Sequence, residues 1–213
     1  MKKEIYLFDF DGTLVDSMPT FLYAVKSALF DFGVETREDL LEIATPRGYT
    51  GTVRYYNSLG YNLDEETLVS RMYSYAFDEY KTRVPLKAGT KETLEALKAR
   101  GASLNILTGS PHKMLDVSLE RLGIAKLFDN ALSCEDFNTT KADPKLYRMV
   151  ADKIGADFSD VIFIDDNIAP IKVAKAEGMT VFGIYDPSSE EYKDEIRAVA
   201  DRYIDSVTEL LKG

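Results

Sequence analysis

Two pairs of aspartates stand where apolar runs of the sequence end. Asp9 and Asp11 follow the run IYLF, and Asp165 and Asp166 follow the run VIFI. Alternate residues of an extended chain point to the same side, so Asp9 and Asp11 present their carboxylates together while Phe10 faces the other way. The ionisation of both carboxylates at this distance costs free energy unless a cation lies between them. The residue types therefore predict a bound cation.

The chemistry of these side chains indicates which cation they would hold. The chain has a single histidine, His112, and a single cysteine, Cys134, and neither stands near the aspartates in the sequence. Oxygen ligands without nitrogen or sulfur suit Mg²⁺. Gly12 allows a sharp turn after Asp11 that leaves backbone amides open to an anion. We therefore predict a Mg²⁺ ion facing a phosphoryl pocket.

Two further polar segments are expected at the same place. Thr108, Gly109 and Ser110 end another apolar run, and Lys141 stands in a turn before a helical segment. Ligands of open parallel sheets bind at the carboxyl ends of the strands, where all of these groups would meet. A lysine there would make the pocket locally positive in a chain whose net charge is −10.

The elements that must position these residues follow from hydrophobic periodicity. Apolar runs that alternate with amphipathic segments predict an α/β fold, a doubly wound parallel sheet with helices on both faces. Strands are expected at 4–8, 103–107, 130–133, 161–164 and 180–184, and helices at 89–100, 111–122, 143–154 and 168–177. The tail, 202–213, is expected to add an edge element and a short helix.

A helical stretch interrupts this alternation after the first strand. Asp16 or Ser17 is expected to cap its first helix. We predict an α/β core formed by residues 1–15 and 85–213, with residues 16–84 inserted as an all-helical cap domain. Its helices are expected at 17–32, 37–43, 48–58 and 65–80, with breaks at Gly33, Pro46 and Gly60.

Composition narrows the possible partners. The 213 residues are 45% hydrophobic and 29% charged, as is usual for a globular protein. The net charge of −10 argues against non-specific binding to nucleic acid or to anionic membranes. No apolar run approaches the roughly 20 residues of a membrane span, and one cysteine fits a reducing compartment. We expect a cytoplasmic monomer without nucleic-acid or membrane partners.

Four segments together carry a family resemblance. DFDGTLVDS, LTGS, KADP and FIDDN, in this order, resemble the signatures of the haloacid dehalogenase superfamily of phosphohydrolases. The insert resembles the helical cap of its phosphoglycolate phosphatases and β-phosphoglucomutases. The resemblance covers essentially the whole chain. It implies a Rossmann-like core and Mg²⁺-dependent hydrolysis of a small phosphorylated metabolite through an aspartyl-phosphate intermediate.

The resemblance also implies a role for each signature residue. Asp9 is the expected nucleophile, and Asp11 the expected general acid and then base. Thr108 and the Gly109 amide are expected to bind phosphoryl oxygens, and Lys141 to supply fixed positive charge.

Asp165 and Asp166 are not expected to serve the metal equally, because adjacent strand residues point in opposite directions. Alignment of the family signature on the downstream segment AKAEGM favours Asp166 as the ligand, together with the Asp9 carboxylate and the Asp11 backbone carbonyl. Asp165 is the second choice, and is otherwise expected near Lys141 or in a contact through water.

The resemblance assigns substrate choice to the cap. Arg47, Arg54 and Tyr55, in the segment PRGYTGTVRYY, are candidates for gripping a second anionic or hydroxyl group, and the alternative for both arginines is a solvated surface charge. The expected substrates are sugar phosphates, phosphoglycolate or nucleoside monophosphates. A sugar phosphomutase on the same fold and a non-catalytic phosphate-binding or regulatory protein are the alternative functions.

Overall fold

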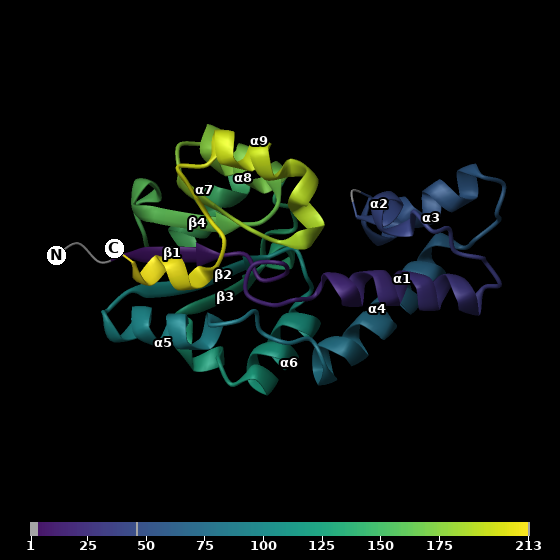
Figure 1. Ribbon diagram of the computed structural model, residues 1–213, viewed down its shortest axis with the longest axis horizontal. Helices are drawn as coiled ribbons and strands as arrows, with labels where there is room; N and C mark the ends of the chain where they lie inside the picture. Colours follow the sequence, from purple (N-terminus) through teal and green to yellow (C-terminus); the bar gives the residue numbers. More distant parts are fainter. Residues whose placement is uncertain (1–3, 46, 213) are drawn as a thin grey trace. The chain divides into compact units, whose positions relative to one another are not determined.

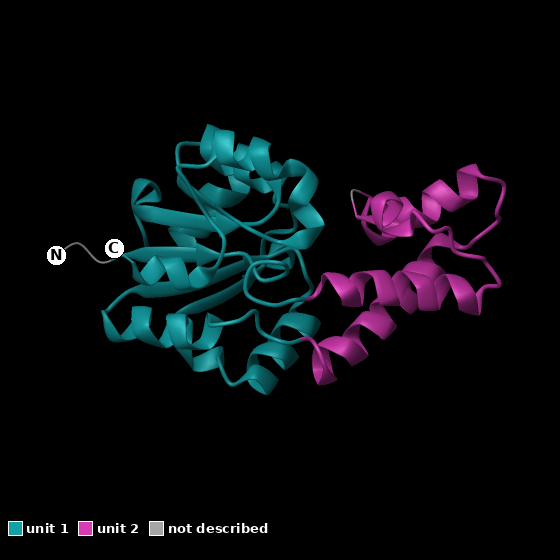
Figure 2. Ribbon diagram, in the orientation of Figure 1, with its two compact units in different colours: residues 1–16, 85–213 teal, residues 17–84 magenta. Residues whose placement is uncertain are grey.

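The computed structural model describes residues 4–45 and 47–212 and divides into two compact units. Unit 1 comprises residues 1–16 and 85–213, and unit 2 comprises residues 17–84, as Figure 2 shows. The break predicted at Pro46 lies outside the described residues.

Unit 1 is built on a six-stranded sheet in which every neighbouring pair of strands is parallel. The strand order is β3-β2-β1-β4-β5-β6, so the chain leaves the central strand β1 in both directions and creates a switch point there. The predicted doubly wound fold is confirmed. The strands are β1 (Ile5–Phe8), β2 (Ser103–Thr108), β3 (Asn130–Ser133), β4 (Val161–Asp165), β5 (Thr180–Ile184) and β6 (Arg202–Ile204).

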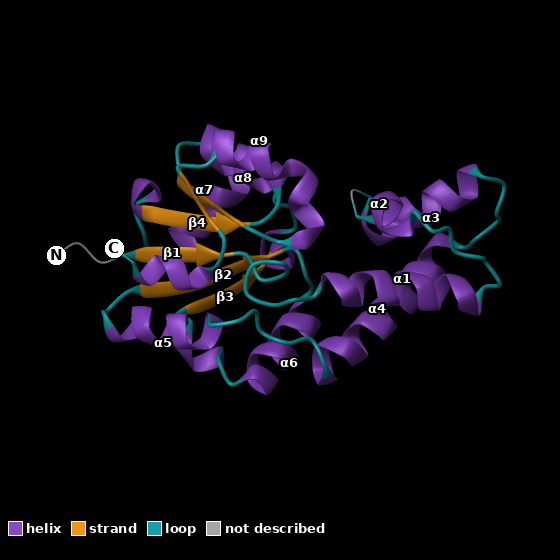
Figure 3. Ribbon diagram, viewed as in Figure 1, coloured by secondary structure: helices purple, strands orange, loops and turns teal. Residues whose placement is uncertain are grey.

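Helices cover both faces of this sheet. α5 (Thr90–Ala99) and α6 (His112–Leu122) lie on one face, and α7 (Pro144–Ile154), α8 (Ile168–Ala176) and α9 (Lys193–Val199) lie on the other (Figures 1 and 3). The sequence of α9, KDEIRAV, has no clear helical periodicity, and this helix was not among those expected. Short 3-10 helices complete the unit: η1 (Ala125–Leu127), η2 (Cys134–Phe137), η3 (Phe158–Asp160), η4 (Pro187–Tyr192) and η5 (Val207–Leu211). Among the described residues, no helix has the length and apolar character of a membrane span.

Tyr147, fully buried in the core of unit 1, links that core to the turn before α7. Its ring packs edge-on against Phe163, with ring centroids 5.4 Å apart. Its hydroxyl donates to the carbonyl oxygens of Lys141, at 2.9 Å, and Pro170, at 3.2 Å. The buried hydroxyl is thus satisfied, and the Lys141 turn is fixed to the core and to α8.

Unit 2 contains α1 (Met18–Asp31), α2 (Leu40–Ala44), α3 (Gly48–Ser58) and α4 (Glu65–Thr82). Its own hydrophobic core includes Leu29, Tyr56, Leu68 and Met72, and α1 packs along α4. The Asp64 side chain accepts a hydrogen bond from Thr67 N at 2.9 Å, which caps α4.

The expectation that Asp16 or Ser17 stands at the N-cap of α1 is confirmed for Ser17, although the expected side-chain hydrogen bond is missing. Ser17 occupies the N-cap position, but its hydroxyl makes no capping hydrogen bond and is buried without a partner among the described residues. A capping hydroxyl accepts from the N–H of the second or third helical residue. The second is Pro19, which has no N–H, and Thr20 N donates to the Ser17 carbonyl instead, at 3.0 Å.

Gly183 in β5 provides a test of the packing between sheet and α9. A Cβ at this position would lie 2.2 Å from Ile196 Cγ2. Gly183→Ala should therefore lower the free energy of unfolding by about 1–3 kcal/mol, measured by urea denaturation. The same change in an Ile196→Ala background should cost less, because the colliding methyl group is gone. Equal costs in the two backgrounds would contradict this contact.

Candidate active site

Three buried aspartates meet at the carboxyl ends of β1 and β4. Asp9, Asp165 and Asp166 each offer a carboxylate oxygen, and these three oxygens lie within 4.8 Å of one another. The parallel register of β1 and β4 brings them together, and Asp9 N donates to Ile164 O at 2.8 Å. All three residues are at most 6% exposed. Buried carboxylates this close require positive charge nearby.

Lys141 supplies positive charge to two of the three. Its Nζ donates to Asp9 Oδ1, and lies 2.8 Å from Asp165 Oδ2. Burial acts to lower the pKa of Lys141, but the carboxylates of Asp165 and Asp9 outweigh it and raise that pKa. The lysine is therefore a permanent charge at this site.

The cluster still has too little positive charge to ionise fully. Burial raises the pKa of Asp9 to about 8; Lys141 opposes that rise, while Asp165 and Asp11 add to it. Burial and the neighbouring carboxylates also raise the pKa of Asp166 well above its usual value. A divalent cation at this site would favour the ionised forms.

The two adjacent aspartates have different partners. Asp165 accepts from Lys141 Nζ on one oxygen and from Asn167 N, at 2.8 Å, on the other. The Asp166 carboxylate accepts from Thr13 Oγ1 at 3.1 Å. Asp165 is thus held on both oxygens by protein groups, and Asp166 has more capacity to bind a metal ion.

Gly12 makes room for the Asp166 carboxylate. Its φ is +77°, and a Cβ there would lie 2.6 Å from Asp166 Oδ2. Only glycine fits this close approach in this backbone conformation. The carboxylate oxygens, their shortage of positive charge and this recess together fit Mg²⁺.

The hydroxyl groups at the end of β2 contact the side chain of Asp11. Asp11 Oδ2 accepts from Ser110 Oγ at 2.6 Å and from Thr108 Oγ1 at 3.3 Å. Ser110 N in turn donates to Thr108 Oγ1 at 2.9 Å. At Gly109, a Cβ would meet nothing within 4 Å, so there is space beside its backbone. Asp11, Thr108 and Ser110, which the sequence predicted at the ends of neighbouring strands, are therefore joined by hydrogen bonds. Gly109 lies between the last two in the chain.

Comparison with known proteins identifies the family of the chain. The family model described as haloacid dehalogenase-like hydrolase matches residues 6–184. The chain belongs to this family. The predicted family is confirmed.

Individual relatives of this hydrolase carry phosphatase names. The phosphoglycolate phosphatase of Haemophilus influenzae (strain 86-028NP) is 30% identical over 187 residues, which cover 83% of each chain. The pyrophosphatase PpaX of Bacillus velezensis is 26% identical over 181 residues, 84% of this chain and 81% of the relative. A crystal structure described as a predicted phosphoglycolate phosphatase, from Haemophilus somnus 129pt, has a TM-score of 0.84 at 25% identity and covers 100% of this chain and 98% of that one. These names support the predicted enzyme class, a phosphohydrolase.

Two charged residues beside the aspartate cluster, Lys87 and Asp186, belong to no motif that would predict them from the sequence. Lys87 Nζ donates to Gly12 O and, at 2.9 Å, to Tyr185 O, and lies 2.8 Å from Asp186 Oδ2 as an ion pair. In the sequence Lys87 belongs to a linker, and Asp186 stands before a proline and two serines, a pattern typical of a turn. Asp186 does cap a turn, since Ser188 N donates to its Oδ1 at 2.9 Å.

The candidate substrate residues of unit 2 have partners within that unit. Arg54 pairs with Glu65 through contacts of 2.7 and 2.9 Å. Arg47 donates to Ile43 O at 2.7 Å and lies 5.0 Å from the centre of the Tyr55 ring. These are contacts of helix-surface charges, and a role in binding substrate remains a prediction.

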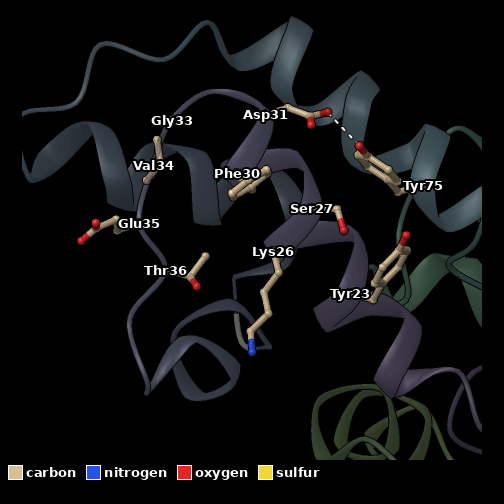
Figure 4. A pocket seen from close by; sticks show the side chains of 10 residues that line it. All are labelled: Tyr23, Lys26, Ser27, Phe30, Asp31, Gly33, Val34, Glu35, Thr36 and Tyr75. Atoms are coloured by element: carbon tan, nitrogen blue, oxygen red, sulfur yellow. Dashed lines mark hydrogen bonds between the residues drawn. The ribbon is translucent and has the colours of Figure 1, made fainter.

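Unit 2 also has a hollow of about 810 Å³ beside α1. Figure 4 shows Tyr23, Lys26 and Phe30 of α1 along it, and Tyr75, whose hydroxyl donates to Asp31 Oδ2 at 2.8 Å. Arg47, Arg54 and Tyr55 are not among the residues that line it.

The raised pKa values of the cluster predict a pH dependence of stability in the metal-free protein. The folded state holds a proton on Asp9 up to a pKa of about 8, whereas the unfolded chain releases it near 3.8. The stabilisation is therefore fully present below 3.8 and is lost as the pH rises through about 8. In EDTA, the free energy of unfolding should fall between about pH 5 and pH 9, and Asp9→Asn should reduce that slope. Identical slopes for the two proteins would disprove the raised pKa.

Proposed function

We propose that this hydrolase is a Mg²⁺-dependent phosphatase that cleaves a small organic phosphate monoester through an aspartyl-phosphate on Asp9. The observation that carries the proposal is the buried cluster of Asp9, Asp165 and Asp166, in which Lys141 contacts Asp9. The relatives named phosphoglycolate phosphatase and pyrophosphatase support a small phosphorylated substrate. A chain with one cysteine suits a reducing compartment, so we place this activity in the cytoplasm. We also propose that the protein acts as a monomer.

We assign the metal site to the carboxylates of Asp9 and Asp166 and the backbone carbonyl of Asp11. A bound Mg²⁺ would screen the negative nucleophile from the negative phosphate. Asp165 keeps its contact with Lys141 in this assignment, and so acts through the lysine.

The residues of unit 1 can perform hydrolysis in two displacements. The ionised Asp9 carboxylate attacks phosphorus, and the bond between phosphorus and the ester oxygen breaks. Asp11 donates a proton to the departing oxygen, then takes a proton from the water that attacks the phosphorylated aspartate and releases phosphate. The Ser110 hydroxyl, which donates to Asp11 Oδ2 at 2.6 Å, orients Asp11 for both transfers.

Binding of the phosphoryl group needs donors as well as charge. We propose that Lys141, the Thr108 hydroxyl and the Gly109 amide interact with the phosphoryl oxygens, where negative charge increases in the transition state. Unit 2, as the cap, would select the substrate, with Arg47, Arg54 and Tyr55 as candidate contacts.

Asp9→Asn tests the nucleophile. The amide cannot form the acyl phosphate, so hydrolysis of p-nitrophenyl phosphate should fall below detection while the circular dichroism spectrum stays that of wild type.

EDTA should likewise abolish wild-type activity, and added Mg²⁺ should restore it. Retained hydrolysis by the variant, or indifference to chelation, would refute the corresponding part of the proposal.

A panel of phosphate esters identifies the substrate class. Phosphoglycolate, sugar phosphates, nucleoside monophosphates and pyrophosphate should be compared by kcat/KM, with release of inorganic phosphate as the readout. Conversion of a sugar phosphate to its isomer, without release of phosphate, would favour the phosphomutase instead.

Asp166→Asn and Asp165→Asn form a matched pair for the metal assignment. Both substitutions remove one negative charge from neighbouring positions, but only Asp166 is assigned as a ligand. Calorimetric titration should find Mg²⁺ affinity lowered at least about tenfold more by Asp166→Asn than by Asp165→Asn. The opposite order would move the assignment to Asp165.

A further inference from the structure

Lys87 connects the turn after β1 with the turn after β5. We propose that Lys87 is a positioning residue: it fixes the Gly12 turn against Asp166 and thereby sets the affinity of the site for Mg²⁺. This inference rests on the proposed function. Lys87 lies outside the four signature segments from which the family resemblance was drawn.

The backbone and the side chain of Lys87 hold the same turn at two points. Lys87 N donates to Leu14 O at 3.0 Å, beside an antiparallel bridge between Val15 and Leu86. The Lys87 ammonium donates to Gly12 O. The second contact reaches the one residue of the turn that has no side chain with which to anchor itself.

The position of Gly12 matters because of what it faces. Its Cα is so close to the Asp166 carboxylate that a Cβ would lie 2.6 Å from Oδ2. The next residue, Thr13, donates to Asp166 Oδ1 at 3.1 Å. A rotation of the backbone at Gly12 would therefore disturb the packing and the hydrogen bond that orient Asp166. Glycine resists such rotation less than any other residue. Gly12 N donates to Val15 O at 3.0 Å, and the Lys87 ammonium holds the carbonyl of the same residue.

The other end of the tether is rigid. Asp186 is 1% exposed, and Ser188 donates to its Oδ1 through both N, at 2.9 Å, and Oγ, at 2.6 Å. Lys87 lies 2.8 Å from the second oxygen of Asp186 and donates to Tyr185 O at 2.9 Å. Unlike an exposed ion pair, this pair is mostly shielded from water, since the Lys87 side chain is 19% exposed. The ammonium is thus held in place and cannot follow Gly12 if the turn moves.

Lys87→Met tests the inference, because methionine keeps an unbranched side chain but removes the donors. Calorimetric titration of the substrate-free protein with Mg²⁺ should show affinity lowered by about tenfold or more, as is typical when a group that orients a metal ligand is lost. With p-nitrophenyl phosphate, kcat should be recovered at saturating Mg²⁺ and KM should stay unchanged. Because Mg²⁺ binding would itself stabilise the folded state, the circular dichroism spectrum and the urea midpoint of the metal-free variant should also be measured; a wild-type spectrum with lowered Mg²⁺ affinity is the expected result.

Lys98→Met is the matched control. Lys98 also pairs with an aspartate, Asp129, but Asp129 lies just before β3, at the opposite end of the sheet from the site. Its removal should leave Mg²⁺ affinity within about twofold of wild type. The double variant Lys87→Met/Asp186→Asn, which removes the unpaired buried charge, should keep the weakened affinity even where stability is regained.

Two outcomes would overturn the inference in distinguishable ways. If wild type binds Mg²⁺ and hydrolyses the ester but Lys87→Met has the affinity of Lys98→Met, Lys87 is only a structural residue and the proposed function stands. If wild type binds no Mg²⁺, the proposed function fails and the inference fails with it.

Discussion

The contact of the Lys141 ammonium with the Asp9 and Asp165 carboxylates is the interaction on which the rest of the site depends. The parallel register of β1 and β4 forces three aspartates into one buried volume, where their mutual repulsion and loss of water oppose ionisation. One lysine reduces this cost without removing it, as the pKa of about 8 at Asp9 indicates. The remaining negative charge makes the site receptive to a divalent cation. A divalent cation and Lys141 together would balance the charge of the three carboxylates.

The same constraint explains why the two adjacent aspartates differ. Asp165 shares Lys141 with Asp9 and accepts from the backbone of Asn167, so it orients the lysine. Asp166 faces a glycine that leaves room for it, and has a threonine hydroxyl as its hydrogen-bond donor. The expectation that the two side chains point in opposite directions is wrong, because Asp165 ends β4 and Asp166 follows it, and an oxygen of each lies in the same cluster. Their hydrogen-bond partners, and not the alternation of a strand, make the two acids chemically distinct.

Sequence predicted most of the fold because the signals for it are local. The apolar runs marked five strands, each within one residue of its observed bounds, whereas α9 is a short helix rich in charged residues and has little periodicity. The signature segments also predicted that Asp9, Asp11 and Lys141 lie together at the carboxyl ends of the strands. Lys87 and Asp186 could not be found in this way. Lys87 contacts carbonyl oxygens of residues 75 and 98 positions away, and no motif in the linker or in the turn predicts these contacts.

The stereochemical course at phosphorus tests the central claim, attack by Asp9, most directly. A phosphate ester made chiral with isotopes of oxygen and sulfur should yield product with retained configuration, because displacement by Asp9 and displacement by water each invert the phosphorus centre. Net inversion would mean that water attacks the ester in a single step, and would contradict the proposed aspartyl-phosphate.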